Sequence, residues 1–252
     1  MARQTKYNLI PFFLLLIYVV LWELIVRILH IDKWILPSPS QTIIALWESR
    51  QLLLQHTFVT LVESFVGLMS GITVAFVVSI LIYSFSFFKK SLYPLLIISQ
   101  TIPFIALAPL LVVWFGFGIL PKIIIVALVC FFPIAVNLID GFTSIDQSII
   151  SNLQLLGANR PQIFRYAVLP ASLPFFFSGL RIAGSYALLT AVVSEWIGAS
   201  SGLGVFMIRA SKSYATDRVF ASILVISFMS LISITIINYC NKLAIPWKTI
   251  KH

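Results

Sequence analysis

The acidic, basic and nucleophilic side chains that could perform chemistry are few in this chain, and they are scattered. The histidines are His30, His56 and His252, and the cysteines Cys130 and Cys240 show no CxxC or Cys/His spacing. Metal sites and catalytic pairs depend on such spacing. The sequence also contains no Gly-x-x-x-x-Gly-Lys-[Ser/Thr] phosphate-binding loop. It therefore predicts no catalytic residue, no metal site and no cofactor bound by this chain.

Five polar residues within apolar runs are instead candidates for a functional role inside a membrane. Glu63 and Glu195 are acidic, and acids inside a membrane are costly enough to be functional candidates. Each lies near one end of its apolar run, so its carboxylate could alternatively reach water. Ser99, Gln100 and Asn137 are neutral, and they could equally form hydrogen bonds between helices.

The elements that must position these residues are predicted to be membrane-spanning helices. The chain has 252 residues, of which 60% are hydrophobic and only 10% charged, whereas charged residues make up about a quarter of a soluble protein. Uncharged runs long enough to cross a bilayer recur. We predict an all-α polytopic membrane protein with about six transmembrane helices, at 9–29, 58–84, 92–115, 119–140, 175–198 and 219–240. Pro103, Pro109 and Pro133 are expected to interrupt the third and fourth spans, which would then lie inside the bundle.

The net charge of +9 is interpreted as a signal of membrane topology. The chain has no Lys/Arg-rich run of the kind that favours nucleic-acid binding. In membrane proteins, basic residues gather at the cytoplasmic ends of spans. Six spans place both termini on one side, and basic residues such as Lys89 and Lys90 favour the cytoplasm as that side.

We divide the chain into a first span with its outer connection (1–57), a core (58–240) with a cytoplasmic loop (141–174), and a cytoplasmic tail (241–252). In the outer connection, Ser40 is predicted to cap a short helix at the membrane surface.

The polar segment 151–170 is predicted to form a helical hairpin beneath the membrane. An apolar stripe at helical spacing ends at Gly157, which can adopt a left-handed capping conformation. A second short helix from Pro161 to Tyr166 begins with proline in its first turn and is expected to end at Leu169-Pro170. The hairpin would expose polar residues, namely Asn159, Arg160, Gln162 and Arg165.

This hairpin resembles the cytoplasmic coupling loop of binding-protein-dependent ABC importer permeases. The family pattern is Glu-Ala-Ala, three residues, Gly, nine residues, Ile, one residue and Leu-Pro. Gly157 and Leu169-Pro170 match it, but Ser151-Asn152-Leu153 stands in place of Glu-Ala-Ala, and Ala167 in place of Ile. The segments 35–40, 110–118, 131–137 and 198–204 are similar to the subfamily for nitrate, sulfonates, taurine and thiamine precursors. Residues 101–110 are more similar to permeases for pyrimidine-type vitamin precursors.

The resemblance implies a type I ABC importer permease in the bacterial cytoplasmic membrane, without ATPase activity of its own. A separate ATP-binding subunit, with ATP and Mg²⁺, would dock at the coupling loop, for which the residues are Gly157, Ala158, Arg160, Arg165, Leu169 and Pro170. The other implied partners are a solute-binding protein outside the cell and a second copy of the permease. The two copies would form a translocation pathway, for which the candidate residues are Glu63, Ser99, Gln100, Asn137 and Glu195. The solute would be a thiamine or pyrimidine precursor, with sulfonate, taurine or nitrate as the alternatives. A more remote alternative, an ion-coupled secondary transporter, would favour inverted repeats, and no repeat is visible.

Overall fold

A computed structural model describes residues 10–99 and 101–246, apart from the side chains of Phe12 and Ile105. All elements in these ranges are helical, as predicted. They are α2 (Ile10–Ile28), α3 (Pro39–Glu48), α4 (Arg50–Ser84), α5 (Ser86–Ser99), η1 (Phe104–Leu107), α6 (Ala108–Phe115), α7 (Leu120–Thr143), α8 (Gln147–Leu155), α9 (Arg160–Ile163), η2 (Phe164–Val168), α10 (Leu169–Glu195), α11 (Leu203–Lys212) and α12 (Thr216–Ala244).

Four of the predicted spans coincide with helices long and apolar enough to cross a membrane. These are α4, α7, the continuous run Arg160–Glu195 that ends with α10, and α12. The first predicted span coincides with helix α2, Ile10–Ile28. The third, 92–115, is wrong as a single span, because helicity stops after α5 and resumes at η1 and α6. The break contains Pro103, which disfavours helical backbone at the residue before it.

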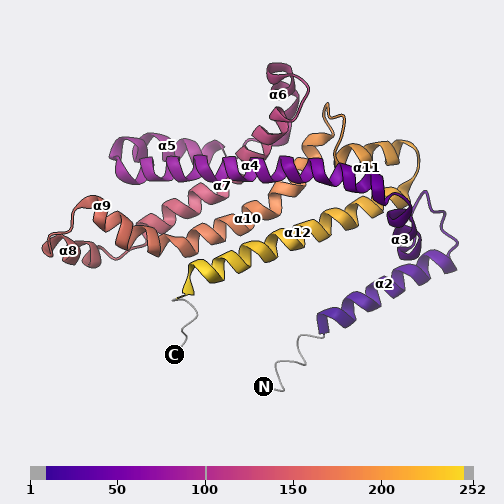
Figure 1. Cartoon of the computed structure of the whole chain (residues 1–252), viewed down its shortest axis with the longest axis horizontal. Coiled ribbons are helices and arrows are strands. Elements are labelled where there is room, and N and C mark those ends of the chain that lie inside the picture. The colour runs from indigo at the N-terminus through magenta and orange to yellow at the C-terminus, as the bar shows by residue number, and fades with distance from the viewer. Residues whose placement is uncertain (1–9, 100, 247–252) are drawn as a thin grey trace.

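Helix α7 forms the centre of the bundle, with α4 on one side and α10 on the other (Figure 1). Close approach depends on glycine: a Cβ atom at Gly71 would lie 2.8 Å from the Ala127 carbonyl oxygen of α7. Small residues allow such contact between membrane helices. The predicted interruption at Pro133 is wrong, because α7 continues through it. Of the two spans predicted to lie inside the bundle, the fourth, α7, does so, whereas α5 packs mainly on α4 and most of its residues are not buried within this one chain.

The long helices give the molecule two distinct ends (Figure 1). We call the end that carries α8 and α9 the hairpin end, and the end that carries α3 and α11 the opposite end. Both α4 and α12 run from the opposite end towards the hairpin end, and α10 returns between α7 and α12. Residues far apart in sequence therefore meet at each end.

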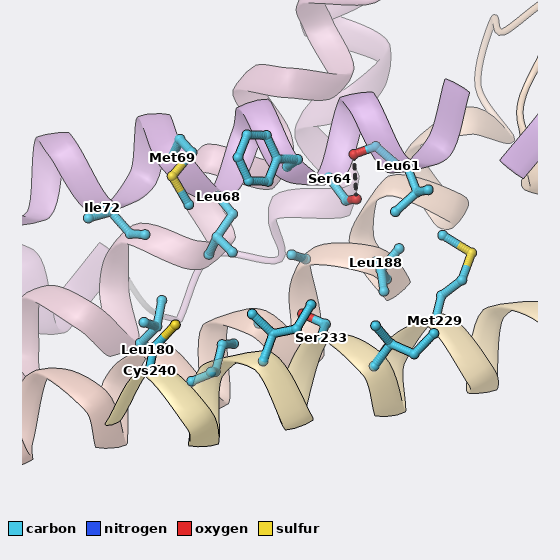
Figure 2. A pocket seen from close by; sticks show the side chains of 16 residues that line it. Leu61, Ser64, Leu68, Met69, Ile72, Leu180, Leu188, Met229, Ser233 and Cys240 are labelled. Carbon is cyan, nitrogen blue, oxygen red and sulfur yellow. Dashed lines mark hydrogen bonds between the residues drawn. The ribbon is translucent and has the colours of Figure 1, made fainter. Parts of the chain in front are cut away.

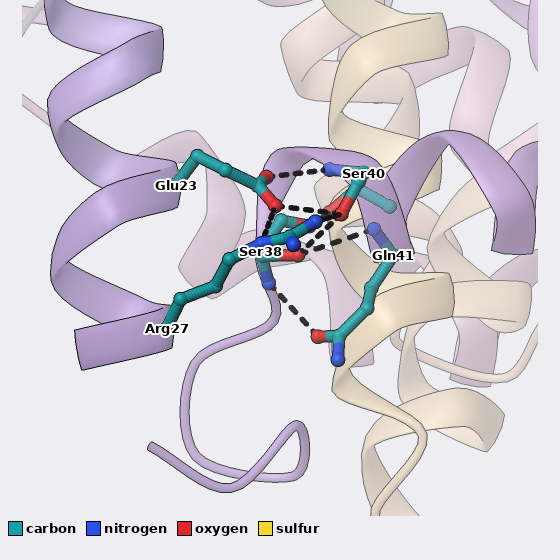
Figure 3. A network of polar contacts seen from close by, with 6 residues as sticks. Glu23, Arg27, Ser38, Ser40 and Gln41 are labelled. Carbon is teal, nitrogen blue, oxygen red and sulfur yellow. Dashed lines mark hydrogen bonds and ion pairs between the residues drawn. The ribbon is translucent and has the colours of Figure 1, made fainter. Parts of the chain in front are cut away.

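A polar network joins α2 to the start of α3 (Figure 3). Ser38 is the N-cap of α3, so the prediction of Ser40 as the cap is wrong. Pro39 occupies the first turn, and the Ser38 hydroxyl accepts a hydrogen bond from the Gln41 backbone N–H at 3.3 Å. Ser40 instead donates its backbone N–H to Glu23 of α2 at 3.0 Å. The Glu23 carboxylate thus meets the positive end of the α3 helix dipole.

An apolar pocket of about 320 Å³ opens between α4, α10 and α12 (Figure 2). Figure 2 shows Leu61, Leu68 and Met69 on one wall and Met229 on the facing one. None of its lining residues is an acid, a lysine, an arginine or a histidine. The pocket therefore offers no charged partner to a polar solute.

Candidate functional site

Helix α8 begins the hairpin at a side-chain cap. Asp146 is its N-cap, and the Asp146 carboxylate accepts the Ser148 backbone N–H at 2.9 Å. This hydrogen bond, with a further one from the Ser148 side chain, holds the pKa of Asp146 below its usual value.

The hairpin turns at Gly157, whose φ of +86° lies in the left-handed region. That conformation is costly for residues with a Cβ atom, which explains the glycine. Asn159 then caps α9, because its side chain accepts the Gln162 N–H while the Gln162 side chain accepts the Asn159 N–H. Two local signals, a left-handed glycine and a reciprocal cap, thus produce the turn between the helices.

The second helix of the hairpin does not end at Leu169-Pro170, contrary to the prediction. Helix α9 passes through a π-helical turn, η2, directly into α10. Leu169 and Pro170 occupy the first turn of α10, where proline is tolerated because its missing N–H needs no partner there. The hairpin is therefore a rigid continuation of a membrane helix.

The tip of the hairpin presents large apolar side chains. Leu155 and Leu156 are 86% and 83% exposed, and Tyr166 is 72% exposed. Arg160 and Arg165 are also exposed, with the Arg165 guanidinium over the Tyr166 ring, whereas Ala158 is partly buried against the core. Apolar tips with a charged rim are typical of surfaces that bind another protein.

An aromatic cluster anchors this hairpin to the bundle. The ring centroids of Tyr83 on α4, Phe142 on α7 and Phe164 on η2 lie 5.4–5.7 Å apart in all three pairs. Ile163 and Val168 are buried beside them in the main core. A displacement of the hairpin would therefore be passed to α4 and α7, because packed cores transmit strain.

A buried polar cluster lies at the opposite end of the molecule. The Lys122 ammonium on α7 donates to Glu63 on α4 at 3.1 Å, and these residues are 6% and 0% exposed. The Thr60 hydroxyl donates to Glu195 on α10 at 2.6 Å, and the Gly204 backbone N–H donates to the other Glu195 oxygen. Neither carboxylate reaches water as the sequence had allowed, and their assignment to a solute pathway stays a prediction.

The same cluster holds the loop before α11. The Gly202 N–H donates to His56 Nδ1, and the Leu203 N–H donates to the Thr60 hydroxyl, both at 2.9 Å. Glu195 thereby lies at the N-terminus of α11, where a negative charge is favoured. The cluster thus joins α4, α7, α10 and α11.

Sequence reasoning missed three members of this cluster, namely His56, Thr60 and Lys122. A signal for two of them was present, because His56, Thr60 and Glu63 recur at the spacing that places residues on one face of a helix. The remaining pathway candidates lie elsewhere. Ser99 donates to the Leu96 carbonyl oxygen, Asn137 donates to the Pro133 carbonyl oxygen, and Gln100 lies outside the described residues.

Gly204→Ala is expected to prevent correct folding of the opposite end. The added Cβ atom would overlap the Val192 carbonyl oxygen, and overpacking typically costs about 1–3 kcal/mol, with larger values where backbone must move. The measurement is the monodisperse fraction and thermal midpoint of the purified protein in detergent. Gly118→Ala is the matched control, since nothing lies within 4 Å of its added Cβ atom. Equal midpoints for the two variants would contradict the prediction.

Comparison with known proteins identifies similar transport proteins. Residues 67–248 match the family described as binding-protein-dependent transport system inner membrane component. The chain is 35% identical, over 98% of both chains, to the formylaminopyrimidine transport permease protein ThiX of Halalkalibacterium halodurans. It is 30% identical over 93% of its length, and 88% of the relative, to the riboflavin transport system permease protein RibX of Chloroflexus aurantiacus.

More distant similarities extend the comparison. The taurine transport system permease protein TauC of Escherichia coli is 29% identical over 92% of this chain and 87% of its own. A chain of the inward-facing MetNI methionine ABC transporter superposes with a TM-score of 0.69, at 19% identity, over 78% of this chain and 98% of that one. The fold is thus that of an ABC importer permease.

Proposed function

Because the chain belongs to the family of binding-protein-dependent transport system inner membrane components, we propose that it forms the solute path of an importer for an amino-substituted pyrimidine. The chain is a multi-pass permease subunit of the ABC transporter class. The pyrimidine assignment is supported by the 35% identity to a formylaminopyrimidine permease across 98% of the chain. Identity to the taurine relative is lower, at 29%.

The docking partner at the hairpin end is proposed to be an ATP-binding subunit. The observation that carries this proposal is the exposed apolar pair Leu155 and Leu156 beside Gly157. Burying this pair in a cleft would remove apolar area from water, and the flanking Arg160 and Arg165 supply charged contacts at the rim. ATP and Mg²⁺ would be bound by that subunit, and this chain would bind no cofactor.

Movement of the docked hairpin is proposed to switch the bundle between two arrangements. The Tyr83–Phe142–Phe164 cluster ties the hairpin to α4 and α7, and η2 continues it into α10. A displacement driven by ATP therefore turns these helices as a rigid unit. Ser151 and Asn152 stand where the family pattern has Glu-Ala-Ala. Both are exposed on α8 and are available for polar contacts with the partner.

The hairpin end is proposed to face the cytoplasm of a bacterial cell, with both termini on that side. Lys89 and Lys90, exposed at the start of α5, support this orientation through the preference of basic residues for the inner side. The opposite end, with α3 and α11, would then receive a solute-binding protein, and a second copy of the chain would complete the pathway.

The substrate assignment predicts a specific competition result. Cells that express the permease with its ATP-binding subunit and binding protein are expected to accumulate radiolabelled formylaminopyrimidine. Excess unlabelled formylaminopyrimidine should remove at least nine-tenths of the signal, about a tenfold reduction, while equal taurine should leave it unchanged. Uptake of labelled taurine, with no uptake of the pyrimidine, would contradict the assignment.

A further inference from the structure

Arg181 is an exposed arginine near the middle of α10, one of the helices long enough to cross a membrane. Its Nε–H donates to the Asn238 side-chain oxygen on α12 at 3.0 Å. In the part of the chain that the structure describes, this is its one side-chain hydrogen bond, and no carboxylate pairs with it. A guanidinium has five N–H donors, so most of them remain available.

Arg181 belongs to a polar strip on α10. Ser178, Arg181 and Ser185 recur at spacings of three and four residues, which places them on one helix face. Ser178 and Arg181 are exposed and Ser185 is half-buried. This strip lies on a helix between α7 and α12 (Figure 1).

Other exposed helix faces in the bundle are strongly apolar. On α4 they present Phe65, Val74 and Val77, and on α12 they present Phe228 and Leu231. Such faces suit contact with lipid chains. A guanidinium in that environment is costly, and arginines in spans therefore face a water-filled cavity or other protein.

We propose that the Ser178–Arg181–Ser185 face of α10 lines the solute pathway, and that Arg181 binds hydrogen-bond acceptors of the solute. This inference rests on the proposed function, because it names the solute-contacting residues of that pathway. The planar guanidinium can donate two parallel hydrogen bonds. The fitting ligand is a small planar solute with adjacent acceptors, such as a ring nitrogen beside a carbonyl oxygen. The Asn238 amide holds the guanidinium in position for that contact.

Water access to this face is the first test, on the assembled transporter in membrane vesicles. Ser185→Cys in a Cys240→Ser background is expected to react with a charged, water-soluble thiol reagent, because the reacting species is the thiolate. Ser70→Cys is the matched control: Ser70 is also half-buried, and both hydroxyls donate to a carbonyl of the preceding turn. Labelling of Ser185→Cys should be at least about tenfold faster. Equal labelling rates for the two variants would overturn the proposal. An absence of labelling at Ser185→Cys would also overturn it, and that result is expected if Arg181 merely extends to lipid headgroups.

Solute recognition is tested by replacing the guanidinium. Arg181→Gln is expected to raise the KM for formylaminopyrimidine uptake about tenfold or more, since hydrogen bonds to charged groups are strong. Arg181→Lys keeps the charge without the planar fork and should recover part of this loss. An unchanged KM in Arg181→Gln would overturn the proposal. Labelling of Ser185→Cys does not depend on which solute is carried, so an error in the substrate assignment alone would leave the labelling result intact.

Discussion

Gly157→Asp is expected to abolish association of the permease with its ATP-binding subunit, and with it solute uptake. Nothing lies within 4 Å of a Cβ atom at this position, so the new carboxylate would project from the hairpin and not into the fold. Docking would then bury an unpaired charge beside Leu155 and Leu156, at a cost of about 3 kcal/mol or more, which is a hundredfold loss in affinity or greater. Co-purification of the two subunits and uptake in cells measure the effect.

The control for this variant is Gly157→Asn. Asparagine carries a similar penalty at the φ of +86° and occupies nearly the same volume, but it has no charge. It should retain a substantial part of the association, and both variants should insert in the membrane at the level of the unmodified chain. If Gly157→Asp co-purifies with the ATP-binding subunit in normal yield, the docking role of the hairpin is wrong.

Lys122→Met is expected to be the most destabilising single change in the buried polar cluster. It would leave Glu63 and Glu195, which are 0% and 1% exposed, without the ammonium that pairs with Glu63. Removing one partner of a buried ion pair typically costs about 3–5 kcal/mol. The thermal midpoint and the unfolding free energy in detergent should both fall. Glu63→Gln should have a smaller effect, because the new amide oxygen can still accept a hydrogen bond from the Lys122 ammonium.

The double variant Glu63→Gln/Lys122→Met separates charge pairing from packing. Because it removes the negative charge of Glu63 together with the positive charge, it should recover about half or more of the loss seen in Lys122→Met. A double variant as unstable as the sum of the single variants would show that the two residues act independently, contrary to the 3.1 Å contact.

The features predicted correctly from sequence depend on signals that are local in the chain. Long apolar runs identified α4, α7, α10 and α12, since a helix that crosses a bilayer must satisfy its own backbone and present apolar side chains. Gly157 marked the hairpin turn because left-handed backbone favours glycine. The family pattern placed the coupling loop over the same residues.

Predictions at proline were less successful, because the effect of proline depends on its surroundings. Pro133 lies within a continuous α7 and Pro170 in the first turn of α10, whereas the helix does break at Pro103. In a packed bundle, neighbouring helices and local adjustments such as the π-turn of η2 compensate for a lost hydrogen bond. Sequence spacing alone does not reveal that compensation.

The sequence by itself determined an all-helical membrane permease with a helical hairpin in its polar segment, and with few polar groups in its spans. Only the tertiary structure decided what those polar groups do. Lys122 pairs with Glu63 across 59 residues and Thr60 with Glu195 across 135, so both acids help to hold the opposite end together. Arg181 lies on an exposed face of α10, where its guanidinium donates to the side-chain oxygen of Asn238 on α12. The physical reason is that the free energy of a charged side chain inside a membrane depends on its neighbours in space. Helix packing decides which residues those neighbours are.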